Sequence, residues 1–188
     1  YVMATDDDFS GTKNGEFRYI GNDEYVEIPH IIKGVNVTSY FGMFQYTNVK
    51  GVKSTNPNVT DMSNMFLNHS ANELDLSQLD TSGVKYMRKM FYGNKSTKID
   101  LSNFDTSNVT SMNGMFYSSN VRELDLSSFD TSNVTDMEGM FAGLLVPNID
   151  LSNFDTSNVT NMKKMFYGAK VDVLDLSSFN TSNVKNMN

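Results

Sequence analysis

A block of 25 residues recurs along this 188-residue chain, and it limits the possible folds more than any other feature. Residues 99–110 and 149–160 are identical, and the same pattern is present in every copy. Self-similarity at a fixed spacing of this size is typical of architectures in which each repeat packs only on its neighbours. The regular copies begin at residues 74, 99, 124, 149 and 174.

Each block contains two hydrophobic periods. Leu124 and Leu126 alternate with polar residues, which is the two-residue period of a short strand with one buried face. Val134, Met137 and the pair at 140–141 follow the spacing of about two helical turns. The intervening Asp-Thr-Ser-Asn favours a turn and a helix N-cap. We therefore predict a right-handed α/β solenoid in which each coil is a short parallel strand, a turn and a short helix.

The first 30 residues lack the block and predict an N-terminal β-rich cap. Two alternating runs, 17–20 and 25–28, flank Gly-Asn-Asp-Glu and favour a β-hairpin. The rest, 31–188, is predicted to be the repeat solenoid of one continuous domain. Its coils are predicted to be degenerate over 31–73 and regular from 74, with the copy at 174 truncated.

Composition excludes several classes of function. A net charge of −7 argues against binding nucleic acid through phosphates, which requires a basic surface. The chain has no cysteine, so a disulfide framework or a Cys-ligated metal site is impossible. No apolar run reaches the roughly 18 residues of a membrane-spanning helix. The 13 methionines fall largely in pairs three residues apart beside a phenylalanine, a pattern that we interpret as core.

The stretch Phe-Asp-Thr-Ser-Asn is similar to the start of an aspartic-protease loop. That loop has Gly where this chain has Ser107 and its equivalents, and copies one strand spacing apart, about 4.8 Å, would form a row instead of one facing pair. His30 and His69 have no recurring partner. We therefore expect no catalytic residues, no cofactor and no enzymatic activity.

Two rows of aspartates recur at the block spacing and would repel one another if stacked. We predict that hydrogen bonds to Ser and to backbone N–H groups offset this repulsion in both rows. Calcium binding between coils stays open as an alternative, since Ca²⁺ takes about six to eight oxygen ligands. Its candidates are the turn aspartates Asp80, Asp105, Asp130 and Asp155.

The repeat resembles that of a known family. Residues 121–129 follow the leucine-rich-repeat signature L-x-x-L-x-L-x-x-N, with Phe129 in the last position. The remainder, V-T-x-M-x-x-M-F, resembles the BspA-like surface proteins, and most of all the 25-residue repeats of mycoplasma lipoproteins and Gram-positive surface proteins. The run 25–44 is similar to the opening segment of that branch, whereas 49–52 departs from its L-D-L-S strand.

The resemblance implies leucine-rich-repeat-type coils in a bacterial extracellular or cell-surface protein, anchored by regions absent from this chain. It also implies adhesion to a host or neighbouring-cell surface protein, matrix protein or glycan. From the residues we expect the solenoid face to provide the contacts, without nucleic acid and without membrane insertion of this segment. A purely structural stalk that presents another domain is the alternative. The partner-binding candidates are Glu73, Asp75, Lys98, Asp100, Glu123, Asp125, Asp150 and Asp175.

Overall fold

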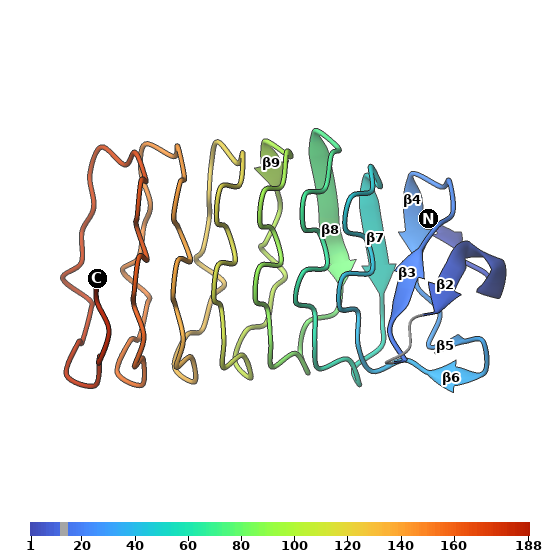
Figure 1. The fold of residues 1–188 in the computed structure, drawn as a ribbon, viewed down its shortest axis with the longest axis horizontal. Coiled ribbons are helices and arrows are strands. Elements are labelled where there is room, and N and C mark those ends of the chain that lie inside the picture. Colours follow the sequence, from blue (N-terminus) through green and yellow to red (C-terminus); the bar gives the residue numbers. More distant parts are fainter. Residues whose placement is uncertain (12–14) are drawn as a thin grey trace.

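The computed structural model describes residues 1–11 and 15–188. The chain winds into coils that stack along one axis, with the N-terminus at one end and the C-terminus at the other (Figure 1). The described elements are β1 (Val2–Met3), the 3-10 helix η1 (Asp6–Asp8), β2 (Phe9–Gly11), β3 (Phe17–Tyr19), β4 (Tyr25–Glu27), β5 (Ile31–Ile32), β6 (Val35–Asn36), β7 (Gly51–Ser54), β8 (Glu73–Leu79) and β9 (Lys98–Ile99).

One sheet joins successive coils. Its strand order is β1-β4-β7-β8-β9 and every pairing is parallel. The register sets Tyr25 beside Gly51 and Gly51 beside Asp75. A register shift follows in β8, where Asp75 Oδ1 also accepts a hydrogen bond from the N–H of Ser77 at 2.9 Å. The same Asx turn recurs in the later coils, and among the described residues beyond β9 one isolated bridge, Asn148 to Val173, continues this sheet.

The predicted hairpin between 17–20 and 25–28 is wrong. β3 pairs antiparallel with β2, whereas β4 joins the parallel sheet between β1 and β7. Burial explains the choice, because β4 inserts Val26 into the core at 0% exposure. A second small antiparallel pair, β5 and β6, lies in the segment for which we predicted the first coil.

The predicted α/β solenoid with short helices is also wrong. Residues 1–11 and 15–188 contain no α-helix, and η1 is the one helical element described. The leucine-rich-repeat-type coil is therefore not supported. In place of the helices a second parallel ladder crosses the stack through isolated bridges. It links Ser39, Asp61, Tyr86, Ser111, Asp136, Asn161 and Asn186.

Along this ladder some backbone N–H groups donate to the next coil and others donate to a carbonyl of their own coil. The N–H groups of Met112 and Gly114 donate to the next coil, to Asp136 and Glu138, at 3.0 and 2.7 Å. The N–H of Met115 instead donates three residues back, to the carbonyl of Met112, at 3.1 Å. An α-helix would use bonds to the fourth preceding residue. The chain thus makes successive turns. The backbone N–H and C=O groups that these turns leave unpaired form hydrogen bonds with the neighbouring coil.

Left-handed backbone explains why these turns do not become a helix. Two residues per coil, four apart, have φ between 50° and 71°. A residue in that region interrupts a right-handed helix. The pairs are 42 and 46, 64 and 68, 89 and 93, 114 and 118, 139 and 143, and 164 and 168.

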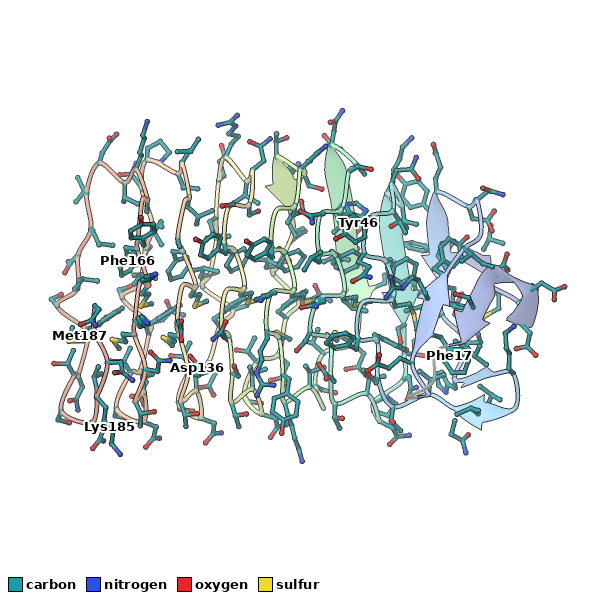
Figure 2. The ribbon with its side chains drawn as sticks, in the orientation of Figure 1. Phe17, Tyr46, Asp136, Phe166, Lys185 and Met187 are labelled. Atoms are coloured by element: carbon teal, nitrogen blue, oxygen red, sulfur yellow. The ribbon has the colours of Figure 1, made fainter. Side chains whose placement is uncertain are left out.

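Stacked aromatic rings and methionines form the core. The six phenylalanines of the second ladder have successive ring centroids 5.5–6.1 Å apart and nearly parallel planes. The rings follow the stack to Phe166 (Figure 2). Every methionine of the repeated pairs is at most 5% exposed, so their assignment to the core is confirmed. The phenylalanines of this stack are Phe44, Phe66, Phe91, Phe116, Phe141 and the partly buried Phe166.

Candidate ligand-binding face and groove

The outward side of the main sheet carries a row of carboxylates, which we call the strand face. Asp75 lies beside Gly51 in the register, and the row continues one aspartate per coil. Asp100 lies close enough to Asp75, and Asp150 to Asp125 and Asp175, for the neighbouring charge to influence its pKa. The strand-face aspartates are Asp75, Asp100, Asp125, Asp150 and Asp175.

Serine holds each of these carboxylates in one orientation. In every coil the N–H of the residue two positions later donates to the aspartate Oδ1 at 2.8–2.9 Å. Hydrogen bonds of this kind favour the charged form, and they lower the pKa of all five carboxyls below the ordinary value. The prediction that each strand aspartate is hydrogen-bonded to serine and backbone N–H groups, which offsets the repulsion between neighbouring carboxylates, is confirmed for this row.

The turn aspartates use the same device. Asp130 Oδ1 accepts from the N–H of Ser132 at 3.0 Å and from its hydroxyl at 2.6 Å. These bonds lower the pKa of Asp130, and the equivalent bonds lower that of Asp155. Each turn aspartate therefore has one oxygen committed to its serine. Within 1–11 and 15–188 no group of three or more acidic or histidine side chains, the calcium candidates Asp80, Asp105, Asp130 and Asp155 included, lies close enough together to hold a metal ion.

The strand face is hollowed where the irregular first coils meet the regular ones. A groove of about 740 Å³ opens at the starts of β7, β8 and β9. Four of the predicted partner-binding residues line it: Glu73, Asp75, Lys98 and Asp100. Two more, Asp125 and Asp150, line a separate hollow of about 280 Å³ two coils further along, whereas Glu123 and Asp175 line neither.

Sequence reasoning missed the other wall of the groove. Tyr25 and Lys50 line it together with Asn48 and Asn72. Lys50 Nζ lies 2.7 Å from Glu24 Oε1, and this ion pair at the rim raises the pKa of Lys50. The one available signal was the departure of residues 49–52 from the repeat pattern.

Gly51 makes room for this wall. A Cβ added at Gly51 would lie 2.6 Å from Tyr25 Cδ1 and 3.1 Å from Tyr1 Oη, so a side chain there would displace the rings. Tyr1 and Tyr25 meet edge to face, with centroids 5.7 Å apart. From this position the hydroxyl of Tyr1 donates to Asp75 Oδ2 at 2.7 Å. The first member of the acidic row is therefore tied to the N-terminal residue.

Coils joined by parallel ladders, with an aromatic and methionine core and a hollowed polar face, define a repeat protein built of stacked coils. The chain belongs to the family described as "Mycoplasma protein of unknown function, DUF285", which matches residues 35–145 and 99–188. The resemblance to mycoplasma repeat proteins is thus confirmed at family level. No curated protein matches the chain. No solved structure matches it either. None of the helical structure in the described ranges could span a bilayer.

Proposed function

We propose that this protein is a bacterial cell-surface scaffold that binds an extracellular partner through the strand face. The observation that carries the proposal is the groove on that face, because it gathers five charged residues of both signs from three successive coils at one accessible position. Concave sites with a few convergent polar groups are the usual form of a binding site. The surface location is taken from the resemblance of the repeats to surface proteins.

Rigidity of the face favours binding. The aspartates are held by their serines, and the second ladder joins each coil that carries them to its neighbours. A partner that contacts such a row therefore pays little for ordering the side chains that it meets. Repeat proteins commonly use extended surfaces of this kind.

A matched pair of triple variants tests the proposal. Asp100→Asn, Asp125→Asn and Asp150→Asn together neutralise the strand face, whereas Asp105→Asn, Asp130→Asn and Asp155→Asn neutralise the turn row. Asparagine keeps the Oδ1 acceptor, so both triples preserve the bonds to serine and change the net charge equally. We expect the first triple to weaken binding to a panel of matrix proteins and glycans by about tenfold or more, and the second to leave it unchanged.

The stalk is the competing function, and one observation favours it: the core and the second ladder run without interruption along the stack, which suits a rigid spacer. A stalk has no reason to bind. Folded wild-type protein that binds nothing on the panel would therefore support the stalk and overturn the binding proposal. Equal losses in the two triples would show that net charge, not the strand face, governs the interaction.

A further inference from the structure

We propose that the groove bounded by Tyr25 and Asp100 is a saccharide-binding subsite. The inference rests on the proposed function and deepens it, because it names one position on the strand face and one chemical class of ligand. Its volume of about 740 Å³ lies within the usual range for small-ligand sites, roughly 300–1,000 Å³.

The polar groups of the groove suit hydroxyls. Glu73 and Lys98 lie opposite one another in the β8–β9 register, and Asp100 follows two residues after Lys98. Lys98 forms no ion pair with any carboxylate in the described ranges, so its ammonium is available to a ligand. Carboxylates only accept hydrogen bonds and lysine only donates them, whereas a hydroxyl does both. A ligand rich in adjacent hydroxyls can satisfy the alternating acceptors and donors together.

Charge argues against the competing ligand classes. Two lysines line the same groove as three carboxylates, at Lys50, Lys98, Glu73, Asp75 and Asp100. A polycation placed there would meet Lys98, and a polyanion would meet the carboxylates at close range. A neutral polyhydroxyl ligand avoids both repulsions. The glycan is therefore favoured over a basic peptide, which would be expected to bind along the purely acidic part of the row.

An aromatic wall completes the subsite. Tyr25 is 42% exposed and lines the groove on the side opposite Asp100. A tyrosine with one accessible side offers apolar surface to the C–H groups of a sugar ring, while its hydroxyl remains a polar handle. The ring is held in place by Tyr1 and by the absence of a side chain at Gly51, so the wall exists before any ligand arrives. Such preorganisation lowers the cost of binding.

The test uses the full 188-residue chain on a printed array of neutral, N-acetylated and sialylated oligosaccharides, with poly-L-lysine as the basic probe. The strongest oligosaccharide is then titrated calorimetrically against single variants. Asp100→Asn has a matched control in Asp155→Asn, which lies in the turn row outside the groove and accepts the same kind of bond from a serine N–H. Lys98→Gln has its control in Lys95→Gln, an exposed lysine that does not line the groove.

We expect a neutral or N-acetylated oligosaccharide to bind, with affinity reduced about tenfold by each groove variant and less than about twofold by each control. A further variant, Asp150→Asn, changes a strand-face carboxylate outside the groove; if it weakens saccharide binding as much as Asp100→Asn does, the subsite is overturned and the strand-face function is left intact. Binding of poly-L-lysine alone would overturn the saccharide inference, again leaving the scaffold function. Absence of binding to every probe by folded protein would overturn both.

Discussion

His69 Nε2 lies 2.7 Å from the carbonyl oxygen of Val49, and this contact determines which ring nitrogen carries the proton. A carbonyl only accepts, so Nε2 is the donor and Nδ1 is left as an acceptor. The side chain is completely buried, and Nδ1 has no partner among the described residues. Burial lowers the pKa of His69 to about 4.

Acid should therefore destabilise the protein before its carboxylates titrate. The folded-state pKa lies below the ordinary 6.5, so the unfolded chain binds more protons between about pH 6.5 and about pH 4, and stability falls as the pH drops through that window. We expect a loss of about 2–3 kcal/mol between about pH 7 and about pH 4.5, measured by urea unfolding. His69→Leu should flatten the profile, whereas His30→Gln, at an exposed histidine, should not. If the free energy of unfolding of His69→Leu still falls as steeply over this pH range, His69 is not the cause of the acid sensitivity.

The same position in the next two coils also holds a buried polar atom without a partner. In the described ranges these atoms are His69 Nδ1, Asn94 Nδ2 and Ser119 Oγ, spaced 25 residues apart, and Leu144 follows in the next coil. Because the buried hydroxyl of Ser119 makes no hydrogen bond, Ser119→Ala removes an unsatisfied polar group and should stabilise the protein by about 1 kcal/mol. Ser96→Ala should instead cost about 1 kcal/mol, since the hydroxyl of this equally buried serine donates to Ala71 O at 2.7 Å. The unfolding temperatures of the two variants should shift in opposite directions. A lower unfolding temperature in both would contradict the claim that the Ser119 hydroxyl is unsatisfied.

Tyr46 and Gly143 occupy equivalent left-handed positions with φ of 61° and 71°. The conformation costs tyrosine about 1–2 kcal/mol, partly offset by the lower unfolded-state entropy of a non-glycine residue. Tyr46→Gly should thus raise the free energy of unfolding by about 0.5–1 kcal/mol. Gly143→Ala should lower it by about 1 kcal/mol, because its Cβ would also lie 3.0 Å from Ser118 Oγ. Chemical denaturation measures both, and a stabilising Gly143→Ala would exclude left-handed strain as the reason.

Ser132 should control the ionisation of Asp130. The hydroxyl of Ser132 is the largest cause of the lowered pKa of Asp130, followed by its N–H. Ser132→Ala removes the hydroxyl and keeps the N–H, so the pKa of Asp130 should rise part of the way towards 3.8. Carbon-13 NMR titration of the carboxyl group measures this, with Asp155 as the internal control. Asp130 favours folding above about pH 3.8, and that contribution is lost as the pH falls through its folded-state pKa.

The helix was the main error of sequence reasoning, and the reason lies in the spacing. Met112, Met115 and Phe116 follow i, i+3, i+4, which a helical face produces. Two successive turns with a left-handed residue at Gly114 bury the same three side chains. Glycine or asparagine at several of the left-handed positions was the available signal, but lysine, serine and tyrosine stand at others. Local pattern alone does not separate the two structures.

The charged side chains of the candidate site could be predicted from the sequence, whereas its tyrosine wall could not. The outward aspartates and Lys98 followed from strand alternation and lie where they were expected. The tyrosine wall did not follow, because Tyr1, Tyr25 and Asp75 meet only after the N-terminal segment joins the parallel sheet. A hairpin of residues 17–28 would have placed Tyr25 elsewhere.

The sequence by itself determined the 25-residue period, the buried methionine and phenylalanine positions, and the two rows of serine-held aspartates, since all of these depend on side-chain type and spacing within one repeat. Only the tertiary structure decided that the second half of each coil is a ladder of turns and that a groove opens beside Gly51. Hydrogen bonds such as that from Gly114 to Glu138 join residues 24 positions apart and exist only once coils are stacked. The neighbouring coil, not the local segment, satisfies the backbone and so selects its conformation.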